Sequence, residues 1–153
     1  MKKILLVTFI ILTSLFSNAQ KFSESLMQQL EKNEKDMFES VSNDDSVLFK
    51  SLAGKEYFTI NADGTSGNLA ETLKGFGKFK GAVTVLSDQQ QRLFDKVALR
   101  TGKATFYFGG KVVAEVLYTS GWVYKNKRWQ FIHWQGTLTN VAPAAPNSNN
   151  ANK

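Results

Sequence analysis

Two side chains of this sequence are suited to moving a proton, His133 and Asp63. His133 is the only histidine, and imidazole titrates near neutral pH without any perturbation. It lies in the apolar segment 129–138, where strand alternation puts it on one face together with Trp129 and Phe131. We interpret His133 as a buried, hydrogen-bonded structural residue, and a general acid–base role is the alternative.

Asp63 is the carboxylate that a proton-transferring enzyme with an apolar cavity would use as its base. Gly64 follows it, and an aspartate–glycine pair is typical of a turn, in which the aspartate accepts hydrogen bonds from nearby backbone. We therefore favour a turn role over catalysis. Glu115, the only charge in an apolar strand segment, is expected to pair with a Lys or Arg across the sheet.

Composition argues against metal and nucleic-acid chemistry. The chain has no cysteine, which excludes disulfides, thiolate metal sites and cysteine nucleophiles, and a single histidine is too few for an ordinary zinc or iron site. The net charge is +6, but the sequence has no arginine cluster and no recognition-helix motif. We expect no metal, no cofactor and no nucleic-acid partner.

Aromatic side chains offer a second kind of chemistry, the binding of a small apolar or amphipathic ligand. The residues that we predict to line such a cavity are Tyr57, Tyr118, Trp122, Trp134 and Gln135. The competing interpretation is that these aromatic residues form ordinary core, which is their usual role in antiparallel sheets.

The elements that position these residues change character once along the chain. Apolar residues at helical spacing predict a helix of about five turns over residues 22–41, and a second short helix follows the turn at 43–45. Asn68 and Glu71 have the spacing of a capping box that opens a third helix. Gly54 and Gly75 follow the second and third helices and are expected to end them.

After residue 77 the pattern is that of strands. Segments 83–86, 92–94, 97–108, 112–124 and 128–138 are rich in β-branched and aromatic residues, and turn signals separate most of them. A short strand is also expected at 57–60. The sequence therefore predicts an α+β domain in which three N-terminal helices pack on one face of a strongly bent antiparallel sheet.

Both ends of the chain are expected to lie outside this domain. Residues 1–19 have a basic start, an apolar run and small residues at 17–19, which is the pattern of a cleaved signal peptide and not of a membrane anchor. Residues 140–153 contain both prolines and few large apolar side chains, so we expect a disordered tail. One domain, 20–139, remains, and we expect it to be periplasmic or extracellular.

A long first helix, two short helices, a strand followed by NADGT and a sheet ending in RWQFIHWQGT resemble the nuclear transport factor 2-like superfamily, in its SnoaL-like and uncharacterised branches. This resemblance implies a cone-shaped, cystatin-like α+β roll. It also implies a cavity at the open end of the cone and frequent dimerisation through the sheet.

Two functional hypotheses follow. The leading one is a secreted, non-enzymatic domain that binds a small molecule in a hydrophobic cavity, dimerises through its sheet, or does both, because no complete catalytic set is apparent. The alternative is a SnoaL-like or ketosteroid-isomerase-like enzyme, with His133 or Asp63 as the base and a tyrosine as the oxyanion donor. A homodimer is expected because helices can cover only one face of the sheet.

Overall fold

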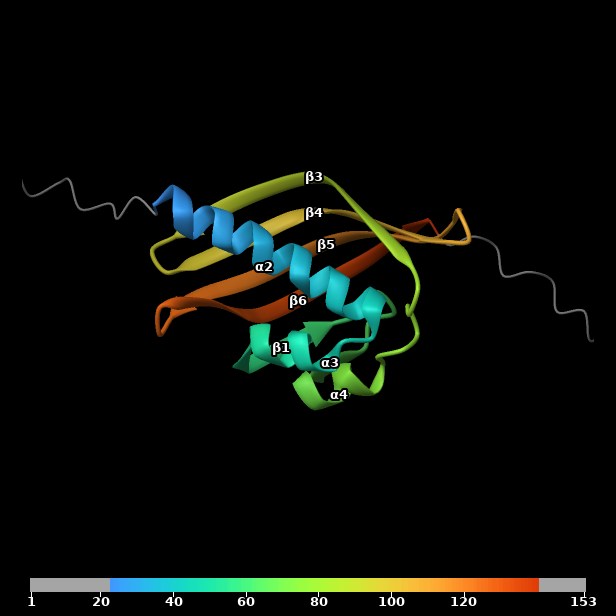
Figure 1. Cartoon of the computed structure of the whole chain (residues 1–153), viewed down its shortest axis with the longest axis horizontal. Coiled ribbons are helices and arrows are strands. Elements are labelled where there is room, and N and C mark those ends of the chain that lie inside the picture. The colour runs from blue at the N-terminus through green and yellow to red at the C-terminus, as the bar shows by residue number, and fades with distance from the viewer. Residues whose placement is uncertain (1–22, 141–153) are drawn as a thin grey trace, which may run out of the picture.

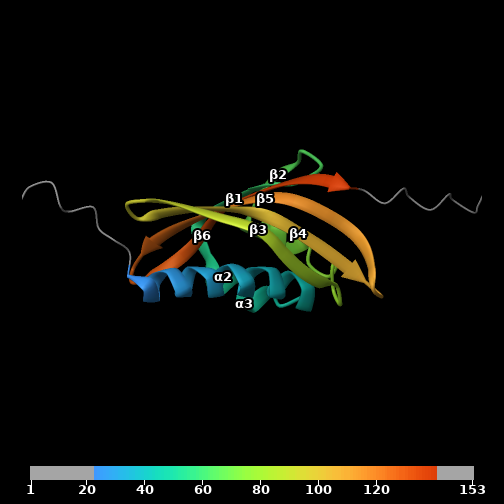
Figure 2. The same cartoon turned by 90° about the horizontal axis from the view of Figure 1, so that it is seen from above.

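The computed structural model describes residues 23–140, so the predicted signal peptide and nearly all of the predicted tail lie outside the described residues. The elements, in chain order, are α2 (Glu24–Asn43), α3 (Ser46–Leu52), β1 (Ala53–Ile60), β2 (Ser66–Asn68), α4 (Leu69–Lys74), β3 (Val83–Phe94), β4 (Val97–Phe108), β5 (Lys111–Lys125) and β6 (Arg128–Asn140). Figures 1 and 2 show α2 lying across one face of the sheet. We call this the inner face, and the opposite one the outer face.

The six strands described form one sheet in the order β2-β1-β6-β5-β4-β3. The prediction of an α+β fold with helices on one face is confirmed, but the sheet is neither purely antiparallel nor strongly curled. β1 pairs with β6 in parallel, whereas the other neighbours are antiparallel. The reason is topological: the chain crosses from β2 through α4 to the far edge at β3, and the meander that follows brings β6 back beside β1 in the same direction.

The second and third helices begin where local chemistry predicts, and α4 ends at Gly75 as expected. The prediction that Gly54 ends α3 is wrong: the helix ends at Leu52, because Ala53 already has extended backbone and continues into β1, which contains Gly54. Asp45 caps α3 by accepting hydrogen bonds from the backbone of its first turn, and Asp44 ends α2 in the left-handed conformation at φ 60°. Asn68 and Glu71 form the predicted reciprocal capping box at the start of α4. No helix within residues 23–140 is long and apolar enough to span a membrane.

Strand β3 is longer than predicted, because residues 87–91 continue it instead of interrupting it. Its pairing with β4 shifts between Ser87 and Gln90, so Asp88 and Gln89 together face Gly102 of β4. Asp88 has φ 54°, which is typical of the extra residue in a β-bulge. The bulge turns the side chain of Gln89 toward the inner face, where it contacts α2.

Strand β6 also contains a bulge, and this bulge overturns the predicted alternation of faces. Phe131 pairs with Trp122 of β5 but His133 pairs with Gly121, so Ile132 is the extra residue. Trp129 and Phe131 are fully buried on the inner side. Beyond the bulge the faces exchange, and we therefore correct the prediction that His133 shares a face with Trp129 and Phe131.

Candidate functional site

Asp63 lies in an exposed turn between β1 and β2. One of its carboxylate oxygens accepts hydrogen bonds from the backbone nitrogen and the hydroxyl group of Thr65, at 2.9 and 2.6 Å. These hydrogen bonds, with the hydroxyl contributing most, lower the pKa of Asp63 from its ordinary value. An exposed carboxylate with a lowered pKa is a poor general base, and this geometry favours the turn role.

His133 lies on the outer face of the sheet. Its ring lies against the half-exposed ring of Phe58, with centroids 4.3 Å apart. Within the described chain its Nδ1 atom is buried and has no hydrogen-bond partner. Burial lowers the pKa of His133 below its ordinary value. Because Tyr118 points into the inner face, toward Glu34 and Gln89, the structure does not bring His133 together with this tyrosine hydroxyl.

The predicted ligand-binding aromatic residues pack mainly in the core. Tyr57 and Trp122 are buried against Phe131, with centroid distances of 5.0 and 4.8 Å. Tyr118 stacks on Trp134 at 5.3 Å. Their role as ligand contacts stays a prediction, since the packing that the structure shows is that of core residues.

Gln135 lies elsewhere, at a shallow depression of about 360 Å³ on the outer face. The walls of this depression include Thr101, Thr119 and Gln135, which face one another in register across β4, β5 and β6. Gln135 is exposed. The depression is far smaller than the groove on the inner face.

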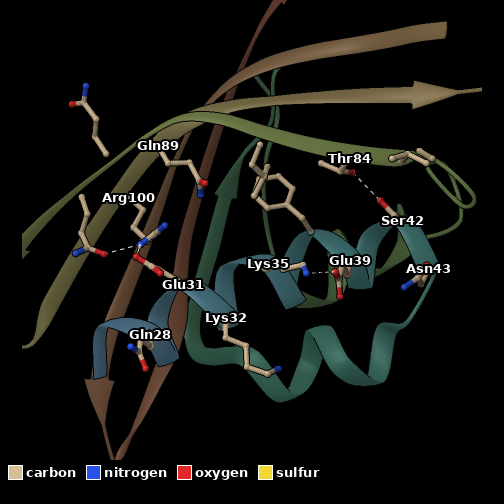
Figure 3. Close-up of a pocket in the computed structure, with 16 residues that line it drawn as sticks. Gln28, Glu31, Lys32, Lys35, Glu39, Ser42, Asn43, Thr84, Gln89 and Arg100 are labelled. Carbon is tan, nitrogen blue, oxygen red and sulfur yellow. Dashed lines mark hydrogen bonds and ion pairs between the residues drawn. The ribbon is translucent and has the colours of Figure 1, made fainter. Parts of the chain in front are cut away.

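A groove of about 1090 Å³ lies between α2 and the strands β3 and β4 (Figure 3). Its helical wall is one face of α2 and extends from Gln28 to Asn43, a span of about 22 Å at 1.5 Å per residue. Phe38, Ala82 and Leu86 supply apolar side chains to the middle and one end, where Lys35 and Glu39 of α2 also line the groove. At the other end Gln89 and Arg100 project from the strands toward the helix.

A buried polar network forms the floor at that polar end. Glu34 is fully buried, and its Oε2 atom accepts hydrogen bonds from Arg100 Nε and from Gln89 Nε2, both at 2.8 Å. Its Oε1 atom accepts a hydrogen bond from Ser120 Oγ at 2.7 Å. Arg100 also donates through Nη1 to Gln91 Oε1 at 2.7 Å. The carboxylate is thus satisfied on both oxygens.

The sequence did not single out Glu34 or pair it with Arg100, although one signal was present. Glu34 lies four residues from Leu30 and four from Phe38, so it occupies the apolar stripe of α2. A carboxylate on a buried helical stripe needs a partner, and that partner comes from β4, 66 residues later. Sequence spacing could not have identified which of the cations it is.

Tyr118 brings a hydroxyl to the edge of this network. Gln89 Nε2 lies 3.4 Å from the Tyr118 oxygen. Burial, and then the negative charge of Glu34, raise the pKa of Tyr118 well above its ordinary value, so the hydroxyl stays protonated. Carboxylate and tyrosine therefore meet here, but Glu34 is held by three donors and is not among the residues that line the groove.

Across the sheet, Glu115 behaves as predicted. Its Oε2 atom lies 3.5 Å from Lys103 Nζ on β4, and Thr139 of β6 donates a hydrogen bond to Oε1 at 2.8 Å. The hydrogen bond from Thr139, with a smaller contribution from Lys103, lowers the pKa of Glu115. The cross-strand pairing is confirmed.

No protein-family model and no curated protein matches the sequence. Solved structures do resemble its fold. An NTF2-like protein from Cytophaga hutchinsonii is 16% identical with a TM-score of 0.63, over 71% of this chain and 94% of that one. The C. elegans CaMKII association domain is 12% identical with a TM-score of 0.66, over 74% and 96%.

A third structure, from Parabacteroides distasonis, is of a protein named as a ketosteroid isomerase. It is 16% identical with a TM-score of 0.63, and the match covers 81% of this chain and 94% of that one. At such identities the likeness concerns the fold alone, because this fold hosts unrelated functions. The sequence-based resemblance is confirmed at that level: the chain has the nuclear transport factor 2-like fold.

Proposed function

We propose that this domain binds a small amphipathic molecule in the groove between α2 and β3. The observation that carries the proposal is the division of the strand side and floor of one groove into an apolar patch at Phe38, Ala82 and Leu86 and a polar end at Gln89 and Arg100, beside a helical wall that is mostly polar and charged. Its volume of about 1090 Å³ slightly exceeds the range that is usual for small-molecule sites, about 300–1,000 Å³. An elongated ligand with an apolar chain and a polar head matches this division.

The test combines native mass spectrometry of the purified protein with calorimetric titration by 1-octanol and octanoate. We expect a co-purified small molecule, binding of at least one probe, or both. Leu86→Trp fills the middle of the groove and should abolish this binding. Val47→Trp, on the exposed face of α3, is the matched control and should leave it unchanged. Absence of any adduct and of any heat of binding up to millimolar probe would refute the proposal.

Self-association through the outer face is a second candidate, favoured by exposed apolar side chains on that face. Phe58, Leu99 and Leu117 are 50%, 36% and 52% exposed. Leu99 and Phe58 lie in one row across the sheet, because Gly121 pairs with Leu99 and His133 pairs with both Gly121 and Phe58. The likeness to the CaMKII association domain supports self-association only in general terms.

Light scattering over a range of concentrations tests this candidate. A dimer mass that falls to the monomer mass in Leu117→Asp, but not in Val47→Asp, would support it. Both positions are highly exposed in the single chain, so neither change disturbs the core. A monomer mass for the unaltered protein at every concentration would exclude it.

The isomerase alternative finds less support in the geometry. It requires a base and an oxyanion donor within about 3 Å of one ligand atom. Asp63 is in an exposed turn, and His133 and Tyr118 lie on opposite faces of the sheet. We therefore propose binding without catalysis.

We also propose that the domain is exported, as the pattern of residues 1–19 predicts. N-terminal sequencing of the protein from the producing cells tests this. A mature chain that begins at Gln20 is the expected result, and a chain that begins at Met1 would overturn it.

A further inference from the structure

In the described chain, each cation that lines the groove already has an acidic partner. Three cations line it in the described chain, Lys32, Lys35 and Arg100. Lys32 pairs with Asp36, and Lys35 lies 3.5 Å from Glu39. The remaining cation, Arg100, is paired with Glu34. An anionic ligand in the groove would therefore compete with the acidic side chain that already pairs with each cation.

At the polar end of the groove, neighbouring carboxylates neutralise the positive charge of Arg100 most completely. The side chains of Arg100 and Glu34 are 6% and 1% exposed, with Nε and Oε2 2.8 Å apart. Glu31 Oε1 lies 4.0 Å from Arg100 Nη1, and Figure 3 shows Glu31 beside Arg100. A ligand carboxylate placed against Arg100 would meet the repulsion of both glutamates, which offsets its attraction to the guanidinium.

Hydrogen-bonding capacity nevertheless remains at this end. Arg100 uses Nε and Nη1, whereas its Nη2 atom has no hydrogen-bond partner within residues 23–140. Arg100 lines the groove, so the Nη2 hydrogens are donors for an acceptor oxygen of a ligand.

Gln89 supplies the complementary acceptor. A carboxylate only accepts hydrogen bonds, so Gln89 must turn its amide nitrogen to Glu34, as it does at 2.8 Å. This fixes the orientation of the side-chain amide and leaves its Oε1 atom without a partner in the described part of the chain. Donor and acceptor thus stand at the same end of the groove, both among its lining residues.

Resting on the proposed binding function, we propose that the groove selects an amphipathic ligand with an uncharged head group that both donates and accepts, such as a primary amide or a hydroxyl. The head's oxygen accepts from Arg100 and its N–H or O–H donates to Gln89. A carboxylate head lacks the donor and adds a third negative charge beside Glu34 and Glu31. The apolar chain lies along Phe38 and Leu86.

Two probes with the same chain and different heads, octanamide and octanoate, test the selectivity by calorimetry at pH 7.5, where octanoate is ionised. We expect octanamide to bind at least tenfold more tightly, a difference of about 1.4 kcal/mol. If octanoate binds equally or better, the head-group inference is overturned while the proposed binding function stands. If neither probe binds, and no other amphiphile does, both fail.

Variants of exposed glutamates test the contribution of charge to binding and leave the buried pair of Glu34 and Arg100 unchanged. Glu31→Gln removes a repulsive charge and should tighten octanoate binding by about two- to five-fold, the range of a weak surface charge effect, with little change for octanamide. Glu56→Gln, an exposed carboxylate on β1 that pairs with Lys125 and does not line the groove, is the matched control and should change neither. Equal effects of the two variants would contradict the charge argument.

Gln89→Met removes the acceptor and should weaken octanamide binding several-fold, with octanoate unaffected. Gln29→Met is its control, since Gln29 is an exposed glutamine of α2 that does not line the groove. Thermal melts of each variant confirm that folding is retained. An unchanged affinity for octanamide in Gln89→Met would overturn the assignment of Gln89.

Discussion

Removing one partner of the ion pair between Glu34 and Arg100 should destabilise the protein severely. Both side chains are almost completely buried, so Glu34→Ala leaves the guanidinium without its compensating charge. A broken buried pair costs about 3–5 kcal/mol. Ser120 and Gln89 also lose their acceptor, and each net hydrogen bond contributes about 1 kcal/mol, which places the expected loss in the upper part of that range.

Urea unfolding followed by tryptophan fluorescence measures this loss, because Trp122 and Trp129 are fully buried. With an m-value of about 1.5 kcal/mol/M, a loss of 4 kcal/mol lowers the midpoint by about 2.7 M. The protein's whole stability is expected to be only about 5–15 kcal/mol, so Glu34→Ala is expected to unfold at low denaturant.

The double variant Glu34→Leu with Arg100→Met distinguishes a buried charge from lost packing. Replacing a whole buried ion pair by apolar residues is often neutral, so the double variant should be more stable than either Glu34→Leu or Arg100→Met alone. The exposed pair Lys35–Glu39 is the control, and its removal should cost less than about 1 kcal/mol. A loss below 1 kcal/mol in the single variants, or additive losses in the double variant, would refute the reasoning.

Three further predictions concern other parts of the fold. Trp129→Ala should cost about 3–5 kcal/mol in a urea melt, because the ring is fully buried and its Nε1 donates to the Leu26 carbonyl; a loss under about 1 kcal/mol would count against this packing. Since burial lowers the pKa of His133 below its unfolded value of 6.5, the unfolded chain binds the proton first, so the free energy of unfolding should fall as the pH drops below about 6.5. His133→Gln should remove that component from melts between pH 7.5 and 5, and an unchanged pH profile would contradict it. Gly102→Ala should cost about 1–3 kcal/mol, since a Cβ there would lie 2.9 Å from the Tyr118 hydroxyl; an unchanged melting temperature would show that the ring moves aside freely.

The face of the sheet on which His133 lies could not be predicted from the sequence. A period of two residues correctly placed Trp129 and Phe131 together, and it would have placed His133 with them in a regular strand. The extra residue Ile132 changes the register against β5 and reverses every later side chain. A single-residue bulge has no reliable sequence signal, since it depends on how β5 and β6 align.

The groove was missed for a related reason. The sequence predicted a hydrophobic cavity lined by aromatic residues, whereas Tyr57 and Trp122 are buried in the core and the groove lies between Phe38 and Leu86 of α2 and β3. Amphipathic periodicity tells which face of a helix is buried, but not how closely each strand approaches that face. The space that remains open depends on that approach.

The sequence by itself determined the order of the helices and of all strands but β2, the starts of the second and third helices, and the hairpin turns. Capping by Asp45 and the box of Asn68 and Glu71 act within a few residues, so neighbouring side chains suffice to specify them. Only the tertiary structure decided the parallel pairing of β1 with β6, and the partner of Glu34 66 residues away on β4. Such pairs depend on packing and topology, because many sequence-distant partners are chemically equivalent until the chain is folded.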